Sequence, residues 1–206
     1  HSYGSARNYV TFCGTYVYSF DKDDLRRDMT CVPYKYDKDL NQEIDMGVTG
    51  MGVGKWSKLY MQSPLGASSG SNTGINSVRM RFADVLLMYA EAVVMGGKAT
   101  ANITPLEAIN KVRDRVGVPH VTEANMRTIE DERILELTYE GSRFFDLLRW
   151  GKVVERFREL ENTDPLFKRF SRAQYMGFKE NKNEWVPLPI DEVEGNPYIT
   201  KNNPGW

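Results

Sequence analysis

The feature that most constrains the fold is a change in hydrophobic periodicity near Val78. From there apolar residues recur every three or four positions, so they share one face of a helix. They are Phe82, Val85, Leu86, Tyr89 and Val93. Two consecutive glycines at 96 and 97 predict the end of this helix.

A second helix is predicted from Thr104 to Gly117. Residues 104–107 (Thr-Pro-Leu-Glu) form a capping box with proline at the first helical position. Its apolar stripe contains Ile109, Val112 and Val116. Two helices with a short link must pack antiparallel, because neither stripe can be buried alone. The pair is typical of one tetratricopeptide-type hairpin.

The first 76 residues predict short strands and loops. Tyrosine, valine and phenylalanine concentrate at 8–20, 31–36 and 55–61, which indicates strands. Glycine and serine dominate 47–54 and 63–74, so we expect a long surface loop interrupted by the last strand.

The C-terminal third predicts one more helix and an irregular tail. The helix runs from about Thr128 to Glu140, and five apolar residues beyond it are expected in the core. Prolines at 165, 187, 189, 197 and 204 break regular structure, so the tail should wrap the helices. The five expected core residues are Phe144, Phe145, Leu147, Leu148 and Trp150.

Composition excludes several classes of protein. The chain has 27 basic and 28 acidic residues, so it has no field that would attract nucleic acid or an anionic membrane. Only Cys13 and Cys31 are present, which excludes a disulfide-dense scaffold and a four-cysteine zinc site but leaves one bridge open. No apolar run is long enough to span a bilayer, and residues 1–4 lack signal-peptide features, so we expect a mature or truncated chain.

Three stretches together resemble the SusD/RagB family: Arg81–Ala92, Glu132–Gly151, and Trp185–Pro197 with the closing 203–206 (Asn-Pro-Gly-Trp). The resemblance covers 77–206 well and 1–76 loosely. It implies a mainly α, SusD-like fold in which tetratricopeptide-like hairpins pack against irregular loops and a few short β-strands. The chain would then be the C-terminal portion of one SusD-like domain, residues 1–206. Its parts would be a ligand-side region (1–76), a helical scaffold (77–162) and a wrapping tail (163–206).

The same resemblance implies a function. Such proteins are lipid-anchored on the outer face of the outer membrane, cap a SusC-like TonB-dependent transporter and deliver glycans to it. The ligand would be an oligosaccharide or polysaccharide, bound without catalysis, metal or organic cofactor. The lipid anchor would lie outside this chain.

Charged residues in the matched stretches are expected to form a scaffold signature. Glu136 and Glu140 are one helical turn apart, which also suggests a glycoside hydrolase. Catalytic carboxylates must flank the scissile bond from two sides, however, so an ion-pair network is the stronger interpretation. A helical-repeat module that binds proteins is a further alternative. The signature is Arg81, Asp84, Glu91, Arg133, Glu136, Glu140, Arg143, Asp146, Arg149 and Trp150.

Sugar capture needs an aromatic face to stack on the ring and polar groups at its rim. Candidates come from the strand and loop half, because Trp150, Trp185 and Trp206 lie in family stretches and are expected to pack. The principal candidates are Tyr3, Asn8, Trp56, Tyr60 and Asn72, followed by Tyr34, Tyr36 and Asn76.

Other motifs fail their chemical requirements. Acidic residues alternate from Asp37 to Asp45, but an EF-hand needs glycine sixth and glutamate twelfth, so only an irregular calcium site remains open. The glycines before Lys55 do not satisfy a phosphate-binding loop. His1 and His120 are the only histidines, and His120 is expected on the surface.

Overall fold

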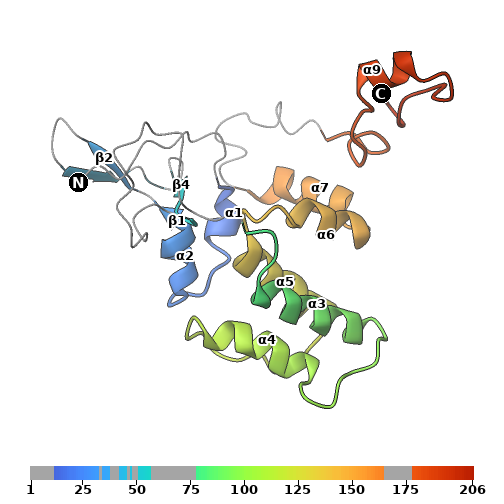
Figure 1. Ribbon diagram of the computed structural model, residues 1–206. Helices are drawn as coiled ribbons and strands as arrows, with labels where there is room; N and C mark the ends of the chain where they lie inside the picture. The colour runs from blue at the N-terminus through green and yellow to red at the C-terminus, as the bar shows by residue number, and fades with distance from the viewer. Residues whose placement is uncertain are drawn as a thin grey trace, which may run out of the picture. The chain divides into compact units, whose positions relative to one another are not determined.

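The computed structural model describes residues 12–32, 34–37, 42–45, 47, 51–56, 78–164 and 178–206 (Figure 1). The chain divides into two compact units, His1–Arg143 and Phe144–Trp206. Helices are the main regular structure of the described residues, and the strands are short. The mainly α prediction is therefore confirmed.

Unit 1 is built around a helical hairpin, α3 (Phe82–Val94) and α4 (Pro105–Asp114), with α5 (Met126–Leu137) packed against both. Figure 1 shows the chain turning back after α3 so that α4 runs alongside it. The buried face of α3 differs from the predicted stripe, because Phe82 and Val85 are exposed while Leu87 and Ala90 are buried. The three helices share one core. Its buried members are Leu86, Leu87, Ala90, Ala108, Ile109, Val112, Ile129 and Leu137.

The helix ends follow the predicted signals. In the capping box the Glu107 amide donates to the Thr104 hydroxyl at 3.2 Å, and the Thr104 amide donates to the Glu107 carboxylate at 2.7 Å. Gly96, in the turn after α3, has φ +103°, a conformation that glycine adopts without strain. The α5 helix begins two residues earlier than predicted, because Asn125 caps it by accepting from the Thr128 amide at 3.0 Å, and it ends at Leu137 and not at Glu140.

The N-terminal part of unit 1 combines two short helices with two strand pairs. Here β1 pairs antiparallel with β4, and β2 pairs antiparallel with β3. The strands at 31–36 are confirmed. Of the strand predicted at 55–61, residues 55 and 56 form a turn and 57–61 lies outside the described residues, while the loop predicted at 47–54 contains a short strand at 52–53. The elements are α1 (Gly14–Val17), α2 (Leu25–Thr30), β1 (Cys31–Val32), β2 (Tyr34–Asp37), β3 (Gln42–Asp45) and β4 (Gly52–Val53).

The strand prediction for 8–20 is wrong where the structure describes it, because residues 14–17 are helical. Phe12, Tyr16 and Phe20 follow one another at four-residue steps, with the Tyr16 ring 5.6 Å from Phe12 and 5.0 Å from Phe20. A helical turn places these rings together against Leu135 of α5. Burial against α5 therefore overrides the β propensity of the aromatic residues.

Unit 2 contains α6 (Arg143–Arg149), which starts at the unit boundary, α7 (Val153–Thr163) and α9 (Ile190–Gly195). The rings of Phe157 and Phe178 stack at 4.5 Å, which holds the segment after 178 against α7. The expectation that the tail wraps the helices stays a prediction.

Some apolar residues of unit 2 are more exposed than the sequence predicts. Leu147 is buried, but Phe145 is 67% exposed, because a seven-residue helix turns only one face inward. Trp185 and Trp206 are half exposed; the Trp206 indole nevertheless donates to the carbonyls of Lys182 and Trp185. The core prediction is thus wrong for Phe145, and the expectation that Trp185 and Trp206 pack is only partly met.

Cys13 is exposed and Cys31 is buried, and no disulfide joins them. Among the residues that the structure describes, no helix has the length and apolar character to cross a bilayer.

Candidate functional site

Three glutamates along α5 organise the polar interior of unit 1. Glu132 and Glu136 are one helical turn apart in α5, so they lie on one side of the helix, and Glu140 follows three residues after its C-terminal end. The side chains of Glu132 and Glu136 are 1% exposed. Buried carboxylates require cationic or hydrogen-bonding partners. We call these three residues the α5 carboxylate ladder.

Glu136 is the centre of the ladder. Its carboxylate accepts from Arg26 at 3.0 Å, Arg81 at 2.5 Å and Arg115 at 2.9 Å. These arginines belong to α2, the N-cap of α3 and the C-cap of α4. Burial alone would raise the pKa of Glu136, but the guanidinium groups of Arg81, Arg115 and Arg26 outweigh it and hold the pKa below its usual value. Glu136 therefore stays ionised.

Glu132 binds the N-terminal segment to α4. Its carboxylate accepts from Arg26 at 2.5 Å and from Arg113 at 2.7 Å. Asp24, the N-cap of α2, completes the group: it accepts from the Arg26 amide at 2.9 Å and pairs with the Arg26 guanidinium at 2.6 Å. Burial would lower the pKa of Arg26, but Asp24 and Glu132 outweigh it, and the pKa is raised.

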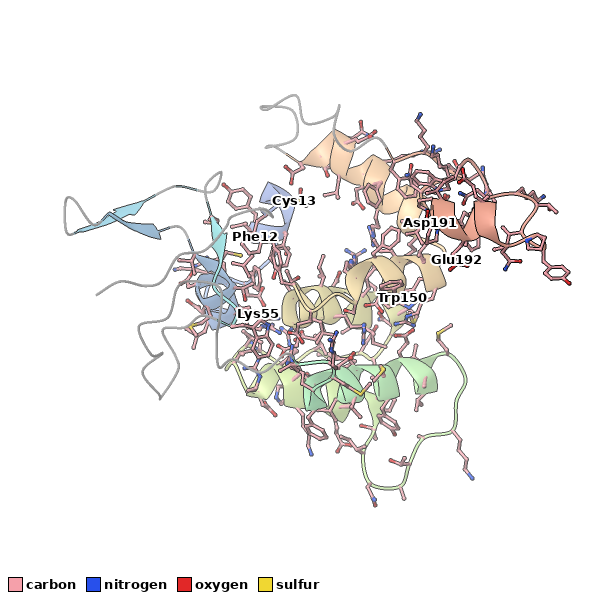
Figure 2. All side chains as sticks on the ribbon, turned by 45° about the horizontal axis from the view of Figure 1, so that its top comes forward. Phe12, Cys13, Lys55, Trp150, Asp191 and Glu192 are labelled. Atoms are coloured by element: carbon pink, nitrogen blue, oxygen red, sulfur yellow. The ribbon has the colours of Figure 1, made fainter. Side chains whose placement is uncertain are left out.

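The Glu140 carboxylate accepts hydrogen bonds from the Arg81 guanidinium at 2.7 Å and from the Lys55 ammonium at 2.6 Å. Lys55 also donates to the backbone carbonyls of Glu136 at 2.6 Å and Thr138 at 3.0 Å, at the C-terminal end of α5. Figure 2 shows Lys55 where the N-terminal segment meets the helices of unit 1. Burial lowers the pKa of Lys55, and Glu140 opposes that shift. Carbonyls at a helix C-terminus and a carboxylate together form a strong site for a cation.

The remaining signature residues also form scaffold contacts. In unit 1, Arg133 pairs with Asp84 at 2.8 Å, Arg143 pairs with Glu130 at 3.2 Å, and Glu91 is buried on α3. In unit 2, Arg149 pairs with Asp146 at 2.8 Å. The Arg149 guanidinium also lies 4.8 Å from the ring centre of Trp150.

This geometry does not favour the glycoside hydrolase alternative. Glu136 lies in α5 and Glu140 three residues beyond its end, and both carboxylates accept from Arg81, which is the arrangement of an ion-pair network and not of two carboxylates that flank a scissile bond from opposite sides. A depression of about 360 Å³ between α3 and α4 is lined by residues other than these glutamates. Its lining comprises Arg81, Phe82, Ala83, Leu86, Lys111, Val112 and Arg115.

Trp56 is the principal ligand candidate whose side chain the structure describes. It follows β4 directly after Lys55, is 44% exposed and has φ +61°. The backbones of Tyr34 and Tyr36 lie in β2. The other candidates, Tyr3, Asn8, Tyr60, Asn72 and Asn76, lie outside the described residues.

The acidic residues proposed for an irregular calcium site, and His120, lie partly within the described residues. Asp37 and Asp45 lie at the ends of the paired strands β2 and β3, while 38–41 falls outside the described residues. No group of three metal-binding side chains occurs among the residues that the structure describes. The irregular calcium site remains untested. His120 is on the surface, as predicted, with its Nε2 2.5 Å from Asp114.

Sequence reasoning missed several members of the network. The four-residue spacing of Glu132, Glu136 and Glu140 was a usable signal for the ladder. No local signal marks Arg26, which lies 106 positions before Glu132, or Lys55, which lies 85 positions before Glu140. The missed members are Asp24, Arg26, Lys55, Arg113, Arg115, Glu130 and Glu132.

A family model for the SusD family matches residues 7–206. The chain belongs to the SusD family. The SusD-like protein P2 of Formosa agariphila is 26% identical over 163 residues, which cover 72% of this chain and 30% of that protein. This SusD-family chain therefore spans about a third of the curated relative.

Solved SusD-like structures agree with this fold. Surface glycan-binding protein A from Bacteroides fluxus is 25% identical with a TM-score of 0.68, and the match covers 93% of this chain and 39% of that one. Surface glycan-binding protein A from Bacteroides thetaiotaomicron in complex with laminarihexaose is 22% identical with a TM-score of 0.66, covering 91% and 39%. The family resemblance of the sequence is thus confirmed.

Proposed function

We propose that this chain is part of a cell-surface protein that captures an oligosaccharide or polysaccharide without cleaving it. The observation that carries the proposal is the SusD family match along residues 7–206. Relatives of similar fold are named surface glycan-binding proteins, and one is described in complex with laminarihexaose. The ladder glutamates fit a non-catalytic scaffold, because each is already bound by at least two cationic side chains.

The location and partner follow from the family. The full protein would sit on the extracellular face of the outer membrane through a lipid anchor. It would pass the glycan to a SusC-like TonB-dependent transporter. Weak binding suits such a handover, so we expect dissociation constants from about 1 mM to 1 μM, or about 4 to 8 kcal/mol.

The ligand contacts would come from the N-terminal region, 1–76, carried by the scaffold of 77–162 and the tail of 163–206. Trp56 would offer an indole face, and Tyr3 and Tyr60 further rings. Asn8 and Asn72 would bond hydroxyl groups at the rim of the sugar.

Calorimetric titration tests the proposal. The probes are laminarihexaose and a panel of other β-glucan, α-glucan, xylan and mannan oligosaccharides. Heat of binding to at least one of them, with no release of reducing ends on prolonged incubation, is expected. Failure to bind every member of the panel would overturn the glycan proposal, and steady release of reducing ends would restore the hydrolase alternative.

A further inference from the structure

Lys55 and Trp56 are adjacent in the chain, but their environments differ. The Lys55 side chain is 19% exposed and directed into the charged interior of unit 1. Trp56 is 44% exposed. The chain therefore passes from the charged interior to the surface between these two residues.

The Lys55 ammonium is fully engaged. Its three N–H groups match three oxygen acceptors: the carbonyls of Glu136 and Thr138 and the carboxylate of Glu140. An ammonium with all its donors used has little freedom to reorient. The backbone of residue 55 is thereby tied to the end of α5.

The residue before Lys55 is fixed as well. The Gly54 amide donates to the Thr30 carbonyl at 2.8 Å, and a Cβ atom on Gly54 would lie 2.3 Å from the Met29 carbonyl oxygen. The chain therefore approaches α2 at a distance that only glycine allows. Trp56 therefore follows two residues that are both fixed, Gly54 by α2 and Lys55 by the end of α5.

The backbone at this turn is strained. Trp56 has φ +61° and Tyr139 has φ +64°, left-handed values that non-glycine residues rarely adopt. The two residues flank the Lys55–Glu140 ion pair, since Trp56 follows Lys55 and Tyr139 precedes Glu140. Such conformations persist only where surrounding contacts impose them.

We propose that Lys55 is a positioning residue that holds the Trp56 indole in a fixed orientation, ready to stack on the apolar face of a sugar ring. This inference rests on the proposed glycan-binding function. A ring that is already ordered loses less conformational freedom when the ligand arrives, so affinity rises without a new contact. Lys55 itself does not touch the sugar.

Calorimetry with the same oligosaccharide panel tests both residues. Trp56→Gly removes the ring at a position whose backbone glycine tolerates, and should weaken binding at least about tenfold. Lys55→Met keeps the length of the side chain and removes the charge. It leaves Glu140 and the Glu136 carbonyl their bonds from Arg81, and should weaken binding about threefold to tenfold.

Trp185→Ala is the matched control, because Trp185 is 54% exposed and lies in unit 2. It should leave the dissociation constant within about twofold of the wild-type value. If it weakens binding as much as Trp56→Gly does, the assignment to Trp56 is wrong.

A spectroscopic measurement separates positioning from general stability. With 5-fluorotryptophan incorporated, the ¹⁹F resonance of Trp56 is identified by its loss in Trp56→Gly. In Lys55→Met this resonance should shift or broaden, while the resonances of Trp150, Trp185 and Trp206 stay in place. If Lys55→Met does not fold, Glu140→Gln, which weakens the ion pair and keeps an acceptor oxygen, replaces it with the same expected signature.

The outcomes distinguish this inference from the function on which it rests. Wild-type protein that binds no glycan overturns the proposed function and the inference together. Wild-type protein that binds, with Trp56→Gly binding equally well, overturns the inference and leaves the proposed function standing. An unmoved Trp56 resonance and unchanged affinity in Lys55→Met show that Lys55 does not position the ring.

Discussion

Arg26 on α2 and Glu136 on α5, 110 positions apart in the chain, are joined by a hydrogen bond of 3.0 Å inside unit 1. Both side chains are almost fully buried, so the pair is shielded from water. The same carboxylate also holds Arg81 and Arg115. One side chain thus connects the N-terminal segment, both helices of the hairpin and α5, and losing its charge leaves three guanidinium groups without a shared counter-ion.

Glu136→Gln should therefore destabilise the protein strongly. Breaking a buried ion pair from one side costs about 3 to 5 kcal/mol, because a charge is left uncompensated. Urea unfolding followed by circular dichroism measures the loss. Glu161→Gln is the control, since Glu161 is an exposed glutamate on α7, and should change stability by less than about 0.5 kcal/mol. Equal stability of the two variants would contradict the central role of Glu136.

Gly54→Ala should also destabilise the fold. The new methyl group would lie 2.3 Å from the Met29 carbonyl oxygen, so α2 and β4 must separate. We expect a loss of about 1 to 3 kcal/mol in the free energy of unfolding. Gly52→Ala, two residues earlier and with nothing within 4 Å of its added Cβ, is the matched control. Identical melting temperatures for both variants would show that the close approach is not needed.

The left-handed backbone at Trp56 predicts an order of stability between two truncations. Trp56→Gly and Trp56→Ala both remove the indole, but only glycine adopts φ +61° without strain. Trp56→Gly should therefore be more stable than Trp56→Ala by about 1 kcal/mol. Thermal unfolding of the two variants side by side measures the difference. The reverse order would mean that residue 56 does not hold this conformation in solution.

The lowered pKa values of Glu136 and Asp24 predict an acid limit to stability. Burial opposes both shifts, but the arginines outweigh it. In the pH range between the folded and unfolded pKa values the unfolded chain binds more protons. The stabilisation is thus complete above the ordinary value of 4.5 for Glu136 and is lost as pH falls through its lower folded pKa. Urea midpoints measured from pH 6 downward should decrease, and less steeply in Glu136→Gln. A midpoint independent of pH would contradict this.

The two thiols should differ in reactivity. Burial raises the pKa of the Cys31 thiol to about 12, while Cys13 is exposed. Because the thiolate is the reactive form, a disulfide reagent at pH 8 should modify one thiol quickly and the second only on unfolding. Cys13→Ser should abolish the fast phase and keep the slow one. Two fast equivalents in native wild-type protein would show that Cys31 is accessible.

The same shift predicts alkaline destabilisation. The unfolded thiol loses its proton from about pH 9, whereas the folded Cys31 keeps it until about pH 12. Over that range the folded state binds more protons, so stability falls as pH rises. Cys31→Ala should reduce this slope in urea midpoints, with Cys13→Ser as the control.

Local signals were sufficient where the stabilising partners are close in sequence. The Thr104–Glu107 capping box and the glycines after α3 need only neighbouring residues, and both were predicted correctly. The predicted stripe of α3 was only partly right, because Leu86 is buried but Phe82 and Val85 are exposed. The SusD/RagB stretches carried the family assignment, which the match over 7–206 confirms.

Local signals failed where burial decided the outcome. Residues 14–17 have the aromatic content of a strand, yet packing on α5 makes them helical. Phe145 is apolar but exposed, because its position on a short helix turns it away from the interior.

The sequence by itself determined the mainly α class, the α3–α4 hairpin and a cluster of paired charges around Glu136 and Glu140. Only the tertiary structure decided which cations bind those carboxylates, because Arg26 and Lys55 contact α5 from segments that are 81 or more positions away in the sequence. Hydrophobic periodicity repeats within a few residues and can be read along the chain. A buried charge instead takes whichever partner the folded chain brings within about 3 Å, a distance that separation in sequence does not specify.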